Sequence, residues 1–370
     1  MANYTIPFTD IVGRYSRFRS LFHHALDDVL DHGQFILGKD VELFESRVAK
    51  LVGSAHAIGV GNGTDALVLS LKAAGVGPGD EVVTSPMSYL ASASAIHLAG
   101  GTPVFADVGD DLNLSPIAVR EVLSTKTKAI LVVHLAGIPA PMEELVEIAK
   151  DNGLHLIEDC AQAFGATING KCVGGFGEFG AVSFHPLKNI GALGDAGLVL
   201  TNNANAASWL KQARNHGHKG RDDCSFWSQN TRLDTLQAAF LDIVLDAYSE
   251  DIAGRREQVK LYRSLLSQSV NYPLVSTFIE PTYNFFMILV DRRDELIRFL
   301  ESKGIEAKVH YPTLIHKMSA SLPTKPLAGD LRNAEKMTAR ILSLPLGQHL
   351  SGSKIEFICR SIIAFQNADK

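Results

Sequence analysis

The chain has 370 residues and a mass of 40.0 kDa, with 46% hydrophobic and 20% charged residues and a formal net charge of -5. This composition is ordinary for a globular enzyme with a large core, and the length predicts two domains. The acidic balance, without a long basic run, argues against nucleic-acid binding as the main role. The longest apolar stretch, residues 129–142, is too short to span a bilayer and is interrupted by His134, Gly137 and two prolines.

Cysteine usage and the first residues indicate the compartment. The cysteines are widely spaced and form no CxxC pair, so they predict neither a metal site nor a disulfide framework: Cys160, Cys172, Cys224 and Cys359. Residues 1–10 lack the basic-then-apolar pattern of a signal peptide. We therefore expect a cytoplasmic protein with no membrane contact.

Hydrophobic periodicity predicts alternating helices and strands. The helices are expected over residues 18–29, 41–51, 66–74, 90–100, 142–151 and 202–216. The strands are expected over residues 81–85, 103–107, 128–135, 154–158, 181–184 and 198–201. The strand–helix–strand order from residue 128 to residue 158 is a βαβ unit, which implies a parallel sheet.

The second half of the chain predicts a domain connection. A long helix is expected from residue 230 to about residue 268. Beyond it, strands are expected over 285–290 and 306–310 and helices over 294–303 and 332–341. We therefore predict a large domain over residues 1–250, including the lead-in helices, and a small C-terminal α/β domain over residues 251–370.

One lysine, Lys188, lies in a glycine-rich loop over residues 185–197, between two apolar runs that predict buried strands. An amine so close to a sheet suits a Schiff base with an aldehyde cofactor, because burial and nearby positive charge lower its pKa and free its lone pair. The alternative is a solvated loop lysine. The rest of the sequence supplies the other parts of a pyridoxal 5′-phosphate site, and these parts favour the cofactor.

A phosphate site is predicted where Gly63, Thr64 and Asp65 open a helix. The N–H groups at a helix start are unpaired, and together with the helix dipole they attract a phosphate. The alternative is ordinary N-capping, because Thr and Asp both favour that position.

Polar and aromatic residues follow several predicted strands. Tyr89 either covers the face of a planar cofactor or packs into the core. Asp159 either caps the next segment or pairs with a pyridine nitrogen, keeping it protonated so that the ring can take up electrons. Gln162, one turn later, either faces the ring or is exposed. Since ligands of parallel sheets bind beyond the carboxyl ends of the strands, we expect Tyr89, His134, Asp159 and Lys188 to converge.

The chain resembles the DegT/DnrJ/EryC1/StrS family, the sugar aminotransferases among the fold-type-I pyridoxal phosphate enzymes. The resemblance spans nearly the whole chain, with the motifs in family order and at family spacing. The motifs are IPF (6–8), NGTDAL (62–67), GPGDEV (77–82), TPVFADV (102–108), KAILVVHLAG (128–137), IEDCAQAFGA (157–166), SFHPLKN (183–189), RNHG (214–217), RLDTLQAA (232–239) and ILSLPL (341–346). The family implies a mostly parallel, seven-stranded sheet flanked by helices, followed by a smaller C-terminal α/β domain.

The resemblance also implies roles for single residues. Lys188 matches the lysine that binds the cofactor and moves the proton, Asp159 the partner of the pyridine nitrogen, and Tyr89 the aromatic that stacks on the ring. Further matches are Gln162 near the ring hydroxyl; Gly63, Thr64 and Ser183 at the phosphate; Asn230 as the residue that reaches the cofactor phosphate of a partner subunit in a homodimer; and His310, Tyr311 and His316 at the sugar.

Two positions depart from the family pattern. Ala196 stands where a second glycine is usual, and Leu135-Ala136 stand where an aromatic residue before the glycine is common. Both changes concern substrate fit more than cofactor chemistry. A sister group that removes a hydroxyl has histidine at the lysine position, so Lys188 argues against that activity.

The resemblance implies an aminotransferase that moves an amino group from L-glutamate to a keto sugar. The expected acceptor is a nucleotide-linked keto-deoxyhexose, destined for a surface polysaccharide or a glycosylated metabolite. The alternatives are a free cyclitol ketone or another keto sugar, a pyridoxal phosphate-dependent sugar dehydratase, and a regulator without turnover. The basic loop over residues 214–221 either attracts an anionic substrate or is solvated surface.

Overall fold

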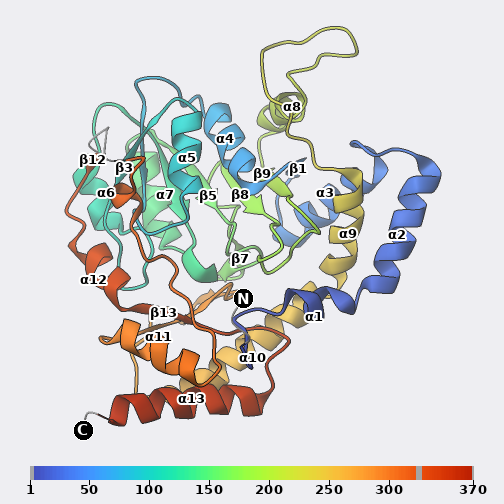
Figure 1. The fold of residues 1–370 in the computed structure, drawn as a ribbon. Coiled ribbons are helices and arrows are strands. Elements are labelled where there is room, and N and C mark those ends of the chain that lie inside the picture. The colour runs from blue at the N-terminus through green and yellow to red at the C-terminus, as the bar shows by residue number, and fades with distance from the viewer. Residues whose placement is uncertain (1–3, 322–326, 369–370) are drawn as a thin grey trace.

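The computed structural model describes residues 4–321 and 327–368, and its central feature is an eight-stranded sheet (Figure 1). In spatial order the strands are β1 (His56–Val60), β9 (Gly197–Thr201), β8 (Phe179–Ser183), β5 (His155–Asp159), β4 (Thr127–Val133), β2 (Glu81–Thr84), β3 (Thr102–Phe105) and β12 (Leu327–Ala328). β9 runs antiparallel to both of its neighbours, and the other pairs are parallel. The mostly parallel α/β class is thus confirmed. The two-residue strand β12 adds one strand to the expected seven.

The sheet is covered by helices on both faces, which explains why its strands read as continuous apolar runs. Alternate residues of one strand enter different cores: Leu131 of β4 packs on one side, and Ile130 and Val132 pack on the other. One face is covered by α4 (Gly63–Ala73), α5 (Ala91–Leu98) and α8 (Ala204–Ala213). The other is covered by α3 (Lys39–Val52), α6 (Pro116–Val122), α7 (Met142–Asp151) and α9 (Thr235–Asp246), and α2 (Arg19–His32) packs on the outside of α9.

A smaller part packs below this body in Figure 1 and has its own core around Tyr262, Phe286 and Ile358. It contains α10 (Tyr248–Leu266), β11 (Phe286–Leu289), α11 (Arg293–Ser302), α12 (Arg332–Arg340), β13 (Ile341–Leu344) and α13 (Gly352–Asn367), with β11 and β13 antiparallel. The short elements are α1 (Ile11–Ser16), the turns η1 (Leu135–Gly137) and η2 (Ile315–Lys317), and a small sheet of β6 (Thr167–Ile168), β7 (Lys171–Cys172) and β10 (Ile279–Glu280). The domain boundary at residue 250 stays a prediction.

Three predicted elements were wrong in detail. The long helix is divided at Ala247, whose N–H bonds back to Val244, and α9 and α10 run in different directions (Figure 1). Residues 306–310 form no strand, because only Lys308 bridges to Ser343 and β13 takes the place beside β11. The helix expected from residue 66 begins at Gly63, because the Asn62 side chain accepts a hydrogen bond from the Asp65 N–H at 2.9 Å.

Over the described ranges, no helix combines the length and the apolar composition that crossing a membrane requires.

Candidate functional site

A cavity of about 900 Å³ lies where the parallel strands end, between the sheet and the smaller part. It is lined by most of the residues that the sequence singled out: Gly63, Thr64, Tyr89, Asp159, Gln162, Ser183, Lys188, His310 and Tyr311. These residues come from five separate segments of the chain. The convergence expected of a parallel sheet therefore holds for Tyr89, Asp159 and Lys188.

Asp159 ends β5 and faces the cavity, with only 6% of its surface exposed. The Ser92 hydroxyl donates to its Oδ2 at 3.0 Å, and the Ala161 N–H donates to its Oδ1 at 3.1 Å. Burial raises the pKa of the Asp159 carboxyl, and the hydrogen bond from Ala161 and the charge of Lys188 oppose this rise. A cationic ring nitrogen at this place would favour the ionised carboxylate.

Lys188 lies on a loop that is fixed from two sides. The Arg14 guanidinium donates to the carbonyls of Pro186, at 3.3 Å, and of Asn189. The Asn189 amide donates to the Thr282 carbonyl at 3.0 Å. Burial lowers the pKa of the Lys188 ammonium, and the Asp159 carboxylate opposes this effect. The loop that carries the amine is thus fixed, and the amine loses its proton more readily than that of a solvated lysine.

The start of α4 approaches β8 very closely. A Cβ atom on Gly63 would lie 2.5 Å from the Cβ of Ser183, so only glycine fits there. Asp65, the acidic residue of this turn, accepts hydrogen bonds from the side chains of Asn62, at 2.9 Å, and Gln229, at 3.1 Å. The first N–H groups of α4 and the Ser183 hydroxyl therefore form a small concave donor surface that suits a phosphate.

Gln162 connects two walls of the cavity. Its Oε1 accepts from the Ala136 N–H at 2.7 Å, and its Nε2 donates to the Tyr311 hydroxyl at 3.1 Å. Gln162 is buried, so the exposed alternative is wrong. Tyr89 is 53% exposed, and its ring centroid lies 6.0 Å from that of Tyr311. Its ring is therefore free to cover a ligand and is not packed into the core.

His310 is held as a neutral ring. It stacks on Phe285 with 3.8 Å between ring centroids, and its Nδ1 lies 3.0 Å from the Ser343 hydroxyl. Burial lowers the pKa of His310 to about 4, and the charges of Lys308 and Lys188 act in the same direction. At neutral pH the ring therefore offers hydrogen-bonding nitrogens without a charge.

Two predicted site residues lie outside this cavity. Asn230 is exposed beside a smaller pocket of about 320 Å³, which shares Asn62 and Asp65 with the main cavity. His316 lies in η2, with its ring centroid 6.1 Å from that of Phe105. Their proposed roles in binding phosphate and sugar have no support from contacts within this chain.

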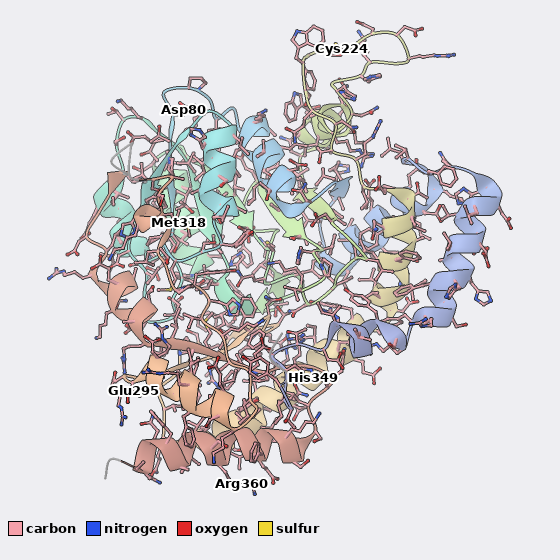
Figure 2. The ribbon with its side chains drawn as sticks, in the orientation of Figure 1. Asp80, Cys224, Glu295, Met318, His349 and Arg360 are labelled. Carbon is pink, nitrogen blue, oxygen red and sulfur yellow. The ribbon has the colours of Figure 1, made fainter. Side chains whose placement is uncertain are left out.

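The basic loop over residues 214–221 does not reach the cavity of its own chain. Arg214 is buried, forms an ion pair with Glu45 and donates to the Gly59 carbonyl at 2.8 Å, so it holds α3 against β1. The chain after Arg214 projects from the body, and Cys224, three residues beyond the loop, lies on this projection in Figure 2. Apart from Arg214 and Gly217, the loop is half-buried or exposed within one chain, as expected of solvated surface.

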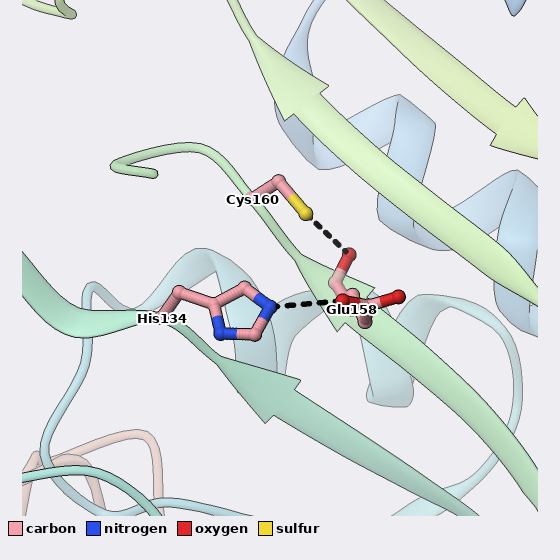
Figure 3. Close-up of side chains that lie close together, drawn as sticks. All are labelled: His134, Glu158 and Cys160. Atoms are coloured by element: carbon pink, nitrogen blue, oxygen red, sulfur yellow. Dashed lines mark hydrogen bonds and ion pairs between the residues drawn. The ribbon is translucent and has the colours of Figure 1, made fainter. Parts of the chain in front are cut away.

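His134 faces away from the cavity, into a buried cluster with Glu158 and Cys160 (Figure 3). Its Nδ1 accepts from the Ala140 N–H at 3.0 Å, and its Nε2 donates to Glu158 at 3.1 Å. Glu158 also accepts the N–H groups of residues 174, 176 and 177 at 2.7–2.8 Å. Hydrogen bonds thus already engage the ligand atoms of the histidine and the carboxylate. The cluster therefore fixes the loop over residues 174–177 and is not a metal site.

The sequence reasoning missed several residues that shape the cavity. Ser92 holds Asp159, while Arg14, Arg255 and Lys308 place positive charge in the wall. Each is an isolated polar residue within an ordinary amphipathic or loop segment, far from the lysine loop in sequence. No local pattern distinguishes them from surface residues.

Comparison with known proteins gives a consistent result. The sequence profile of the DegT/DnrJ/EryC1/StrS aminotransferase family matches residues 18–363. The dTDP-3-amino-3,4,6-trideoxy-alpha-D-glucose transaminase of Streptomyces venezuelae is 38% identical over 93% of this chain and 92% of its own length. A protein of Geobacillus stearothermophilus named a pleiotropic regulatory protein is 39% identical over 97% of this chain and 98% of its own length.

The crystal structure of S. venezuelae DesV in complex with a ketimine intermediate superposes with a TM-score of 0.94 at 34% identity, covering 99% of both chains. The match in sequence and the match in structure thus each extend over almost the full chain. The chain belongs to the DegT/DnrJ/EryC1/StrS aminotransferase family.

Proposed function

We propose that the protein transfers an amino group from L-glutamate to a keto sugar, with a nucleotide-linked keto-deoxyhexose as the acceptor. The main support is that Lys188 and Asp159 face one cavity beside the donor surface at the start of α4. The high identity to a dTDP-sugar transaminase over almost the whole chain supports the substrate class.

The cofactor is pyridoxal 5′-phosphate, on which the family depends. The residues fit it: the close approach of Gly63 to Ser183 brings the first N–H groups of α4 and a hydroxyl together for the phosphate, and the buried Asp159 suits a protonated ring nitrogen. When bound, this cofactor supplies a carbonyl that takes up the amino group and a ring that takes up electrons. Tyr89, Gln162 and Lys188 surround the remaining space.

Each side chain of the site has a separate role. Lys188, whose pKa burial lowers, is suited to take up a proton at its Nζ and to release it again within the cavity. Asp159 would hold the ring nitrogen of the bound cofactor in its protonated form. Gln162 is fixed by the Ala136 N–H and keeps the Tyr311 hydroxyl in position. Neutral His310 presents a hydrogen-bonding edge to the sugar without repelling Lys188.

Other activities have less support. A free cyclitol ketone or another keto sugar would use the same residues, and the acceptor panel described below separates these substrates. A dehydratase is disfavoured because Lys188 occupies the position where that group has histidine. The Geobacillus relative is named a pleiotropic regulatory protein, but a regulator without turnover would not need a lysine with a lowered pKa in a cavity of this size.

We also infer a cytoplasmic homodimer in which Asn230 reaches the cofactor phosphate of the partner subunit. The support is that Asn230 is exposed beside a smaller pocket. This pocket shares Asn62 and Asp65 with the main cavity and so borders the donor surface at the start of α4. Mixing inactive Asn230→Ala and Lys188→Ala chains tests this, because hybrid dimers would regain one intact site. No recovery on mixing would contradict the shared site. Sedimentation and cell fractionation test the assembly and the location.

The function is tested by the visible absorbance of the purified holoenzyme. L-Glutamate is expected to remove the cofactor band, and the true keto-sugar acceptor, added after the glutamate is removed, is expected to restore it. The panel contains dTDP-, UDP- and GDP-linked keto sugars and a free cyclitol ketone. A protein that binds the cofactor but shows no change with any donor would refute the aminotransferase.

A further inference from the structure

Two arginines in the cavity wall have no assigned ligand. Arg14 lies on α1 and is only 7% exposed, and Arg255 lies on α10. Both line the cavity that holds Lys188, although about 240 residues separate them along the chain. Fold and packing thus bring two positive charges to one side of the proposed active site.

Neither guanidinium has a carboxylate partner within ion-pair distance among residues 4–321 and 327–368. Arg14 donates to the carbonyls of Pro186 and Asn189, and Arg255 donates to the Tyr283 carbonyl at 3.1 Å. Asp251, whose charge acts on both guanidinium groups, is already bound by Arg17 at 2.9 Å. Each of the two arginines therefore has a carbonyl partner but no carboxylate bound to it.

The residues around Arg14 and Arg255 also leave these two positive charges without a bound carboxylate. Burial lowers the pKa of Arg255 to about 10, and the charge of Arg14 acts in the same direction. Lys308, the other cation of this wall, lies 3.2 Å from Glu306, which also accepts the Phe8 N–H at 2.7 Å. Glu306 is thus already engaged. Asp251 and Glu306 are each bound by another cation, and the two like charges of Arg14 and Arg255 make the wall suited to an anionic group of a ligand.

We propose that Arg14 and Arg255 form the subsite for a carboxylate of the amino donor. Arg14 is bound to carbonyls on both sides of Lys188, so its guanidinium is anchored to the loop of the reacting amine. An amino acid is small, and its carboxylates lie only a few bonds from the nitrogen that reacts. Phe8 and Leu346 line the same cavity and suit the methylene groups between the two carboxylates of glutamate.

The rival ligand for this wall is the diphosphate of the acceptor. That group is separated from the reacting carbon by the sugar ring, so it would bind farther from the Lys188 loop than a donor carboxylate. Arginine pairs both anions well, because its planar donors match carboxylate and phosphate oxygens. The inference rests on the proposed function. Measuring the half-reaction with the amino donor and the half-reaction with the keto sugar separately shows which of the two ligands the arginines bind.

The test uses the holoenzyme with Arg255→Gln, which keeps an amide donor for the Tyr283 carbonyl but removes the charge. The matched control is Arg256→Gln, since Arg256 is the next residue on α10 and donates to the Pro281 carbonyl at 2.9 Å, outside the cavity. Each half-reaction is titrated separately by the cofactor band, and glutarate binding is measured by calorimetry as a readout that needs no turnover.

Arg255→Gln is expected to weaken L-glutamate and glutarate binding by about 10- to 100-fold, the effect of losing a hydrogen bond to a charged group. Keto-sugar binding is expected to change by less than about threefold, and Arg256→Gln is expected to leave both ligands unchanged. Arg255→Lys, which retains the charge, is expected to recover part of the glutarate affinity. If Arg255→Gln fails to fold, Arg255→Lys is titrated with the same ligands in its place.

Two results would overturn the carboxylate subsite. Weaker binding of the nucleotide sugar alone would assign the arginines to the diphosphate. Unchanged binding of both ligands would show that the arginines have no ligand. A wild-type holoenzyme whose band responds to no amino donor would instead refute the proposed function, so the two failures are distinguishable.

Discussion

Lys188→Ala is expected to reduce the single-turnover rate with L-glutamate by at least about 10³-fold, within the range attributed to a positioned acid or base. The other lysine and the histidines that line the cavity are engaged elsewhere, and His185 accepts the Leu187 N–H through its Nδ1 at 3.2 Å. Lys308 lies against Glu306, and His310 is tethered to Ser343 and stacked on Phe285. The rate is measured by rapid mixing, following the cofactor band.

The matched control is Lys72→Ala, because Lys72 is exposed on α4 and lies outside the cavity. That variant is expected to keep the wild-type rate. Small primary amines in the buffer are expected to restore part of the activity of Lys188→Ala, since they can enter the vacated space and carry the proton. A variant that turns over at the wild-type rate would remove Lys188 from the mechanism.

Asp159→Asn is expected to have opposite effects on catalysis and on the stability of the cofactor-free protein. Turnover is expected to fall by at least about 10²-fold, because a neutral amide cannot keep the ring nitrogen protonated. Without cofactor, burial raises the pKa of Asp159 in the folded state, so the ionised carboxylate destabilises the fold. This cost is absent below the unfolded pKa and grows as the pH rises through the folded pKa.

The cofactor-free asparagine variant is therefore expected to melt about 3 °C above wild type at pH 7, and this advantage is expected to disappear near pH 4. Thermal unfolding with and without cofactor, at both pH values, measures the effect. Asp195→Asn is the control, because Asp195 lines the same cavity but is exposed. A stability difference that is independent of pH would show that the carboxylate charge is not its cause.

The parts of the site that could be predicted are those in which a local signal and a topological rule coincide. Asp159 and Lys188 follow apolar strands, and the rule for parallel sheets brings such positions together. Arg14 and Arg255 could not be predicted, because they meet only through the packing of α1 and α10. His134 obeyed the same rule as Asp159, but its side chain lies on the other side, where Glu158 binds it.

The secondary structure likewise could be predicted where a local signal was enough and not where packing decided. Strands buried on both faces are recognisable from continuous apolar runs, and β4 and β5 were placed to within a residue or two. The break at Ala247 left no mark, because the sequence on both sides favours a helix. Residues 306–310 have the apolar alternation of a strand, but β13 forms the ladder with β11 and leaves them a single bridge.

The pairing of β12 with β3 joins the smaller part to the sheet of the larger one. Asp107, just beyond β3, accepts the N–H groups of Asn333 and Ala334 at 2.9 and 2.8 Å, and in the other direction Ile6 packs into the core of the smaller part. Each part thus contributes a segment that packs on the other. Unfolding of either part would remove these contacts, so we expect the two parts to unfold in one transition rather than separately.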